Sequence, residues 1–116
     1  MRALNFYSSV YHHNLVLRQK KCTIRLGDKA HKYSEGDLVW VTYGGRFQQR
    51  KKIFTAVIDR VIVKPLSQLT AEDVSGEHPD MRSISDVAAF LKEVYGRPVS
   101  PEETVSVVYF SEVVEE

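Results

Sequence analysis

The sequence predicts an α+β fold, a small and highly twisted sheet or barrel with short helices covering its mouth. Two observations support this prediction. Five or six segments have the β-branched and aromatic content of strands, and three short helical segments interrupt them without the regular alternation of a doubly wound sheet. The longest β-type run, residues 53–63, is too long for a flat strand in a small domain and must bend, as the wall of a barrel does.

Length and composition are those of one globular domain, residues 1–116, with 43% hydrophobic and 27% charged residues. Sixteen basic residues balance fifteen acidic ones, so contact with a nucleic acid requires a local basic patch. Cys22 is the single cysteine, which excludes an internal disulfide and indicates a reducing compartment. Because the sequence has neither a long apolar run nor a signal peptide, we expect a cytoplasmic protein with no membrane partner.

The N-terminal part contains a strand and then a helix. Residues 3–6 are a short apolar strand, and Ser8 or Ser9 can cap a helix over residues 8–17. Adjacent histidines at 12 and 13 point in directions about 100° apart on a helix, and no nearby side chain completes a ligand set. We therefore expect no metal and no cofactor. The helix should bury four side chains: Val10, Tyr11, Leu15 and Leu17.

The middle of the chain reads as a turn, a strand and a long hairpin. Residues 34–37 have the glycine and acid composition of a tight turn, and residues 38–43 form a strand closed by Gly44 and Gly45. The following long run is expected to bend at Asp59 and Arg60 and to end at Pro65.

Two capping boxes open the remaining helices, Thr70 with Asp73 and Ser83 with Asp86. Gly96 ends the second helix, and residues 104–110 form the closing strand. One apolar stripe of the second helix should face the core: Ile84, Val87, Ala88, Leu91, Val94 and Tyr95.

The stretch of residues 20–25 gathers three cations and a hydroxyl in a strand-like segment. Successive side chains of a strand point to opposite faces, so Cys22 and Ile24 should enter the barrel interior while Thr23 and Arg25 line a cleft. The same alternation favours Lys21 over Lys20 as the partner of Thr23. The alternative is a solvated strand end with ordinary surface cations.

The pattern Lys20-x-x-Thr23-x-Arg25, placed after a helix and before the Glu35-Gly36-Asp37 turn, resembles the ASCH domain, and the similarity runs over nearly the whole chain. Leu69-Thr70 followed by Glu77 matches the order and spacing of a second marker of the family. The resemblance implies a PUA-like β-barrel linked to RNA and nucleoside chemistry.

Small ASCH proteins that resemble this chain act as 4-acetylcytidine amidohydrolases with a catalytic lysine, threonine and glutamate. Carried over by position, these residues are Lys20, Thr23 and Glu77. The resemblance therefore selects Lys20 where strand alternation favours Lys21, and we adopt Lys20. The chain departs from its close relatives at Arg18, where they have a glycine, the residue best suited to a left-handed turn.

The implied chemistry requires a perturbed lysine. A threonine hydroxyl becomes nucleophilic when a base removes its proton, and a lysine acts as that base only if burial or a neighbouring cation, such as Arg25 or Lys21, lowers its pKa. Glu77 would raise the pKa of Lys20, so it is better suited to act on water or the leaving amine, or to accept an exocyclic amino group. Candidate stacking surfaces for a base are Tyr7, Trp40, Tyr43 and Tyr109.

A second basic stretch, residues 46–52, has one aromatic residue at an expected hairpin tip and could follow phosphates, or it could be a solvated hairpin whose charges prevent edge pairing. The residues expected to bind nucleic acid are Lys21, Arg25, Arg46, Arg50, Lys51 and Lys52. The sequence favours an RNA- or nucleotide-binding ASCH domain. The alternatives are a metal-independent amidohydrolase of an acylated cytidine and an interaction domain without a ligand.

Overall fold

The computed structural model describes residues 1–7, 14–45 and 48–114. Their strands form one mixed sheet in the order β1-β3-β4-β5-β2, in which β1 runs parallel to β3 and the other neighbours are antiparallel. The strands are β1 (Arg2–Phe6), β2 (Cys22–Leu26), β3 (Leu38–Tyr43), β4 (Lys51–Pro65) and β5 (Thr104–Glu112).

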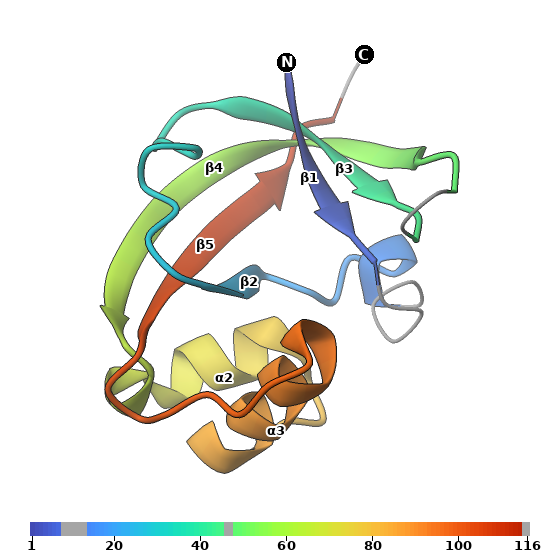
Figure 1. Ribbon diagram of the computed structural model, residues 1–116. Coiled ribbons are helices and arrows are strands. Elements are labelled where there is room, and N and C mark those ends of the chain that lie inside the picture. Colours follow the sequence, from blue (N-terminus) through green and yellow to red (C-terminus); the bar gives the residue numbers. More distant parts are fainter. Residues whose placement is uncertain (8–13, 46–47, 115–116) are drawn as a thin grey trace.

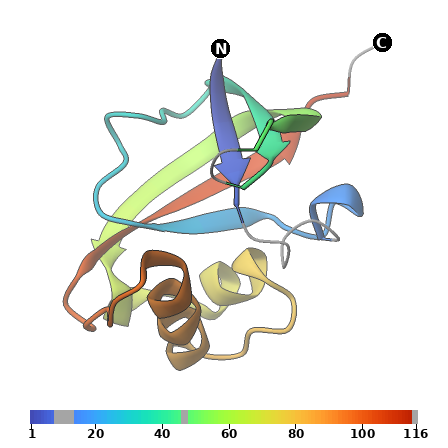
Figure 2. The same ribbon diagram turned by 45° about the vertical axis from the view of Figure 1, so that its right-hand side comes forward.

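The sheet curls into a half-barrel (Figure 1), and the short 3-10 helix η1 (Leu66–Gln68) leads from β4 into two helices. These helices, α2 (Ala71–Glu77) and α3 (Ile84–Tyr95), lie together beneath β2 (Figure 2). Phe90 of α3 packs against the apolar cluster of the barrel interior. The predicted fold class, a small α+β barrel with short helices at its opening, is confirmed.

β4 bends where the sequence predicts. Its pairing with β5 shifts register between Ile58 and Arg60, so Asp59 is the extra residue of a bulge. Before the bulge Ala56 and Ile58 face the barrel interior, whereas after it Val61 packs on that same interior cluster. The bulge therefore lets one long strand keep its apolar side chains inward while it curves.

Two apolar clusters lie on opposite faces of the sheet. The interior cluster fills the concave face. The helix-side cluster fills the space between β2, β5 and the helices. The interior cluster consists of Leu4, Phe6, Leu15, Tyr33, Val39, Val41, Phe54, Ala56, Ile58, Val108 and Phe110. The helix-side cluster consists of Cys22, Ile24, Leu66, Leu69, Val74, Val87, Leu91, Val105, Val107 and Tyr109.

The turn and cap predictions are confirmed. Both capping boxes form, with the Thr70 and Ser83 side chains accepting from the Asp73 and Asp86 N–H groups. Gly96 ends α3 in the left-handed conformation with a φ of 73°. In the turn at residues 34–37, the Asp37 N–H donates to the Ser34 carbonyl oxygen over 3.0 Å.

Three burial predictions are wrong. Cys22 and Ile24 are buried, but on the helix side of the sheet, because β2 lies between α2 and the barrel interior and both of its faces are covered. Leu17 is 52% exposed, because the helical residues end at 16. Val94 and Tyr95, in the last turn of α3, are also exposed.

The structure describes only the end of the predicted helix over residues 8–17. Residues 14–16 are helical and Leu15 is buried in the interior cluster, as predicted. Val10, Tyr11 and the two histidines lie outside the described residues.

Candidate functional site

Lys20 and Glu77 form a buried ion pair. The Lys20 Nζ donates to the Glu77 carboxylate Oε2 and to the Glu77 carbonyl oxygen, and the two side chains are 0% and 1% exposed. Burial lowers the pKa of Lys20 although the Glu77 carboxylate acts in the opposite direction. Two residues that are 57 positions apart in the chain, both predicted as site residues, are thus in direct contact.

A close approach of α2 to the start of β2 brings the pair together. The Lys21 N–H donates to the Gly76 carbonyl oxygen over 3.0 Å. A Cβ atom at Gly76 would lie 2.9 Å from the Cys22 Sγ, nearer than a carbon and a sulfur can pack. Sequence reasoning did not single out Gly76, although a glycine inside a helix is a signal of close packing.

A buried polar cluster holds the other end of α2. Asp73 accepts from the Tyr109 hydroxyl over 2.5 Å and pairs with Lys64 over 2.5 Å. Burial raises the pKa of the Asp73 carboxyl, but hydrogen bonds from Lys64, the Thr70 N–H and Tyr109 outweigh it and hold that pKa below its usual value. The cluster fixes α2, and with it Glu77, on the sheet.

The Cys22 thiol lies beside this cluster and donates to the Asp73 carbonyl oxygen over 3.3 Å. Burial, assisted by the Glu77 carboxylate, raises the pKa of that thiol to about 12. Cys22 therefore remains a neutral packing residue at physiological pH.

Thr23 and Arg25 lie on the opposite face of β2. The Arg25 Nε donates to the Thr23 Oγ1 over 3.0 Å, and the Arg25 Nη2 donates to the Asn5 carbonyl oxygen over 3.0 Å. The Phe6 ring lies within reach of two cations, 5.0 Å from the Arg25 Cζ and 5.5 Å from the Lys20 Nζ, measured to its centroid. Phe6 and Arg25 therefore connect Thr23 to the Lys20–Glu77 pair.

A cavity of about 700 Å³ opens at Thr23, between the end of β1, the middle of β2 and the C-terminal half of α3. We call it the Thr23 cavity. Its polar and aromatic lining comes from Asn5, Phe6, Tyr7, Thr23, Arg25, Phe90, Glu93 and Tyr95.

The other predicted residues are distributed over the surface. Lys21 is exposed whereas Lys20 is buried, because regular β2 pairing begins only at Cys22 and strand alternation does not extend back to the lysines. Arg50 reaches the Thr23 cavity through Tyr7, whose hydroxyl accepts from the Arg50 Nη2 over 3.3 Å. Lys51 and Lys52 are exposed on β4, and Arg46 lies outside the described residues.

Of the predicted stacking residues, only Tyr7 lines the Thr23 cavity. Trp40 is exposed, with the Lys52 Nζ 5.7 Å from its ring centroid, and Tyr43 is half-buried. Tyr109 is buried, and the Arg60 Cζ lies 4.2 Å from its ring centroid.

The described residues lack two features. None of the helices in residues 1–7, 14–45 and 48–114 has the length and apolar character to cross a membrane. In the same part of the chain, no three His, Cys, Asp or Glu side chains are arranged to hold a metal ion.

The fold is that of solved ASCH-domain structures. The chain is similar to the ASCH domain of Lactobacillus crispatus JV V101, with 16% identity and a TM-score of 0.67 over 96% of this chain and 78% of the other. It is equally similar to an Enterococcus faecalis V583 protein described by the family model DUF984, with 16% identity and a TM-score of 0.68 over 97% and 80% of the two chains.

A third solved structure, of a hypothetical protein, matches with 13% identity and a TM-score of 0.63 over 95% of this chain and all of the other. No family model and no curated protein matches the sequence. At these identities the comparisons establish the fold, and they confirm the fold that the sequence resemblance implied.

Proposed function

We propose that the protein is an ASCH-family domain that binds a nucleoside or nucleotide in the Thr23 cavity. The fold and the pattern Lys20-x-x-Thr23-x-Arg25 support the family. The observation that carries the ligand is the composition of the cavity, which is lined by Tyr7, by Phe6 and by Arg25, whose Cζ lies 5.0 Å from the Phe6 ring centroid.

These groups complement a nucleobase, which has a flat face that stacks on aromatic rings and edges that exchange hydrogen bonds. The cavity volume of about 700 Å³ lies within the usual range of small-molecule sites. The Asn5 side chain is held by hydrogen bonds to the Gly44 carbonyl oxygen and from the Thr42 hydroxyl, so the cavity wall is formed before any ligand arrives.

Calorimetric titration with cytidine, uridine, adenosine and their 5′-monophosphates tests the proposal. Tyr7→Ala should weaken binding about 5- to 150-fold, because stacking on an aromatic side chain contributes roughly 1–3 kcal/mol per base. Trp40→Ala is the matched control, since Trp40 is 44% exposed against 50% for Tyr7 but does not line the Thr23 cavity. Equal losses in both variants, or no binding by the wild type, would refute the proposal.

Single-stranded RNA is a separate arm of the same experiment. If the ligand is part of an RNA, binding of a short oligonucleotide should weaken as salt rises, and charge reversal at Arg50, Lys51 and Lys52 should weaken it further. If the affinity for the oligonucleotide depends neither on salt nor on the charge reversal, the ligand is a free nucleoside or nucleotide.

A second candidate function is hydrolysis of 4-acetylcytidine, and the buried Lys20–Glu77 pair favours it. Lys20, with its lowered pKa, would remove the Thr23 hydroxyl proton. Thr23 Oγ1 would attack the acetyl carbonyl, the C–N bond would break, and cytidine would leave with a proton on its amino nitrogen. Water, activated by Glu77, would then hydrolyse the acetyl-threonine ester to acetate. The Arg25 Nε donor would stabilise the Thr23 oxygen as it becomes negative.

Chromatographic detection of cytidine and acetate tests this candidate. Thr23→Val should abolish turnover and Thr23→Ser should retain it, because only serine preserves a hydroxyl, while Lys21→Ala should have little effect. Turnover by Thr23→Val would exclude Thr23 as the nucleophile. A wild type that binds cytidine but releases no acetate from 4-acetylcytidine would leave the binding function alone.

A further inference from the structure

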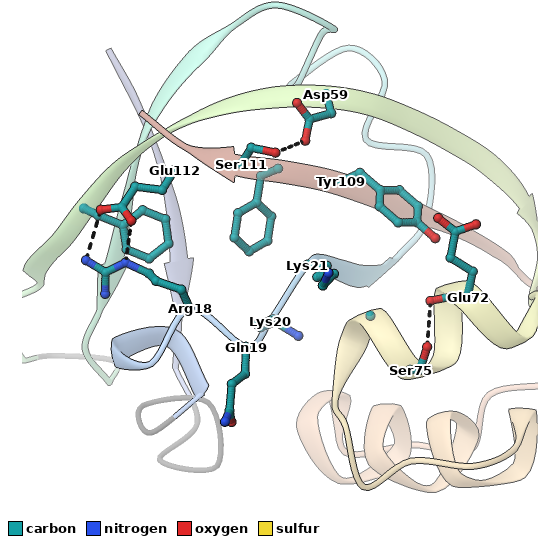
Figure 3. Close-up of a pocket in the computed structure, with 13 residues that line it drawn as sticks. Arg18, Gln19, Lys20, Lys21, Asp59, Glu72, Ser75, Tyr109, Ser111 and Glu112 are labelled. Atoms are coloured by element: carbon teal, nitrogen blue, oxygen red, sulfur yellow. Dashed lines mark hydrogen bonds and ion pairs between the residues drawn. The ribbon is translucent and has the colours of Figure 1, made fainter. Parts of the chain in front are cut away.

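A second cavity, of about 610 Å³, lies on the other side of the segment of residues 18–21, between that segment, α2 and the end of β5 (Figure 3). We call it the window cavity, because it opens through the barrel wall to the interior rings of Phe54 and Phe110. The Thr23 cavity shares none of its lining residues, and the nucleoside binding proposed there does not use it, although Lys20, the base of the second candidate function, is among the residues that line it.

Two irregularities of the backbone form this cavity. On one wall, the Phe110 N–H donates to the Lys21 carbonyl oxygen, but the Lys21 N–H turns away to Gly76, so pairing with β5 stops there. On the other wall, the β4 bulge makes Asp59 the extra residue and leaves it exposed. Bulges often redirect a side chain beside a functional site.

Two arginines stacked on aromatic rings hold the walls. Arg18 pairs with both carboxylate oxygens of Glu112 and lies 4.3 Å from the Phe54 ring centroid. Arg60 pairs with Glu72 over 3.0 Å and lies 4.2 Å from the Tyr109 ring centroid. In each case a cation on an aromatic ring neutralises a glutamate that lines the cavity.

Most of the charged side chains that line the window cavity are paired with a side chain of opposite charge, and two are not. Lys20 is neutralised by Glu77, Glu112 by Arg18 and Glu72 by Arg60. Among the cavity residues that the structure describes, Lys21 and Asp59 have no ion-pair partner, and Asp59 accepts only from the neutral Ser111 hydroxyl over 2.5 Å. The cavity therefore presents one uncompensated cation and one uncompensated carboxylate beside the rings of Tyr109 and Phe110.

We propose that the window cavity binds a small zwitterion. Its anionic group pairs with the Lys21 ammonium at the centre of the cavity (Figure 3). Its ammonium group pairs with Asp59, and its apolar body covers Tyr109 and Phe110. A neutral or singly charged molecule of the same size would leave one of the two charges without a partner.

Nuclear magnetic resonance titration of the full chain tests the proposal with ω-amino carboxylates from glycine to 6-aminohexanoate. This series varies the distance between the two ligand charges. The best-matched member should shift the backbone amide signals of Gln19, Lys21, Ser75 and Ser111. Its carboxamide and its N-acetyl derivative, which each lack one charge, should bind about three- to tenfold more weakly.

Two variants test which side chain of the protein recognises each charge of the ligand. Lys21→Gln should remove the preference for the acid over the carboxamide, and Asp59→Asn should remove the preference for the amine over the N-acetyl derivative. Lys92→Gln and Asp80→Asn, which change charges outside both cavities, should leave both preferences intact. The proposal is overturned if no member of the series shifts these signals, if the best-matched member and its two derivatives bind equally, or if either preference survives in its variant. Binding of cytidine at the Thr23 cavity is unaffected by any of these outcomes.

Discussion

At the scale of single residues, Arg18 has the most unusual backbone. Its φ of 60° is the only positive value at a non-glycine position in residues 1–7, 14–45 and 48–114. A left-handed conformation costs an L-residue about 1–2 kcal/mol. The ion pair with Glu112, the Phe54 ring and donation to the Leu15 carbonyl oxygen over 3.1 Å offset this cost.

Replacing Arg18 by glycine and by alanine separates the backbone from the side chain. Both variants lose the contacts with Glu112 and Phe54, but only Arg18→Gly relieves the left-handed strain. We expect Arg18→Ala to have a free energy of unfolding about 1 kcal/mol lower than Arg18→Gly. Urea denaturation of the two variants measures this difference, and equal stabilities would show that the segment relaxes out of the left-handed conformation.

The sequence singled out Arg18 and the residues of the Lys20–Glu77 pair, but not the direction in which the neighbouring lysine side chains point. Arginine in place of the glycine of close relatives put a left-handed turn at Arg18 in doubt, but the structure has one there nonetheless. The resemblance joined Lys20 to Glu77. Strand alternation failed for Lys21, because a side-chain period of two holds only where a strand exists, and β2 begins one residue later.

At the scale of elements, the contact between α2 and β2 depends on a glycine that costs helix stability. Glycine inside a helix is about 1 kcal/mol less favourable than alanine. At position 76 any side chain would collide with the Cys22 sulfur. The helix therefore gives up intrinsic stability so that Glu77 can reach Lys20.

A double-mutant cycle tests this interpretation. Gly76→Ala should lower the free energy of unfolding despite the better helix propensity of alanine, and Cys22→Ala should lower it by leaving a small cavity. The double variant should be more stable than the sum of the two changes predicts, because the new methyl group occupies the space left by the sulfur. Strict additivity in urea denaturation would contradict the proposed contact.

Elements defined by local chemistry were predictable, and contacts between elements were not. The Thr70 and Ser83 capping boxes and the Gly96 cap each depend on a few neighbouring residues. The bulge at Asp59 followed from the length of one apolar run. By contrast, the Asp73–Tyr109–Lys64 cluster joins three segments that are separate in the sequence, so no local sequence pattern predicts it.

At the scale of the whole molecule, Arg25 joins the two edges of an open sheet. β1 and β2 are the edge strands, and the Arg25 side chain on β2 donates to the Asn5 carbonyl oxygen on β1. In a full barrel, backbone hydrogen bonds would join these two edge strands. Here the Arg25 side chain links them instead.

Removing this link should loosen β1. Arg25→Met retains an unbranched stem but loses the hydrogen bonds, so the opening free energy of β1 amides should fall by about 1.5–3 kcal/mol. Hydrogen exchange of the native protein measures the change, with the amides of β4, in the centre of the sheet, as the internal reference. Arg82→Met, an exposed arginine away from both edges, is the matched control. Unchanged protection of β1 in Arg25→Met would show that pairing with β3 alone secures it.

The strand order has a further consequence for how the protein is made. β2 lies near the beginning of the chain, but Cys22 pairs with Tyr109 in the last strand. Thr23 and Arg25 therefore leave the ribosome long before their pairing partners in β5 have been synthesised. Until then β2 has no neighbouring strand. The Thr23 cavity is consequently assembled only after β5 has been synthesised, and a nascent chain that stops before Thr104 contains every proposed catalytic residue but no place to hold them.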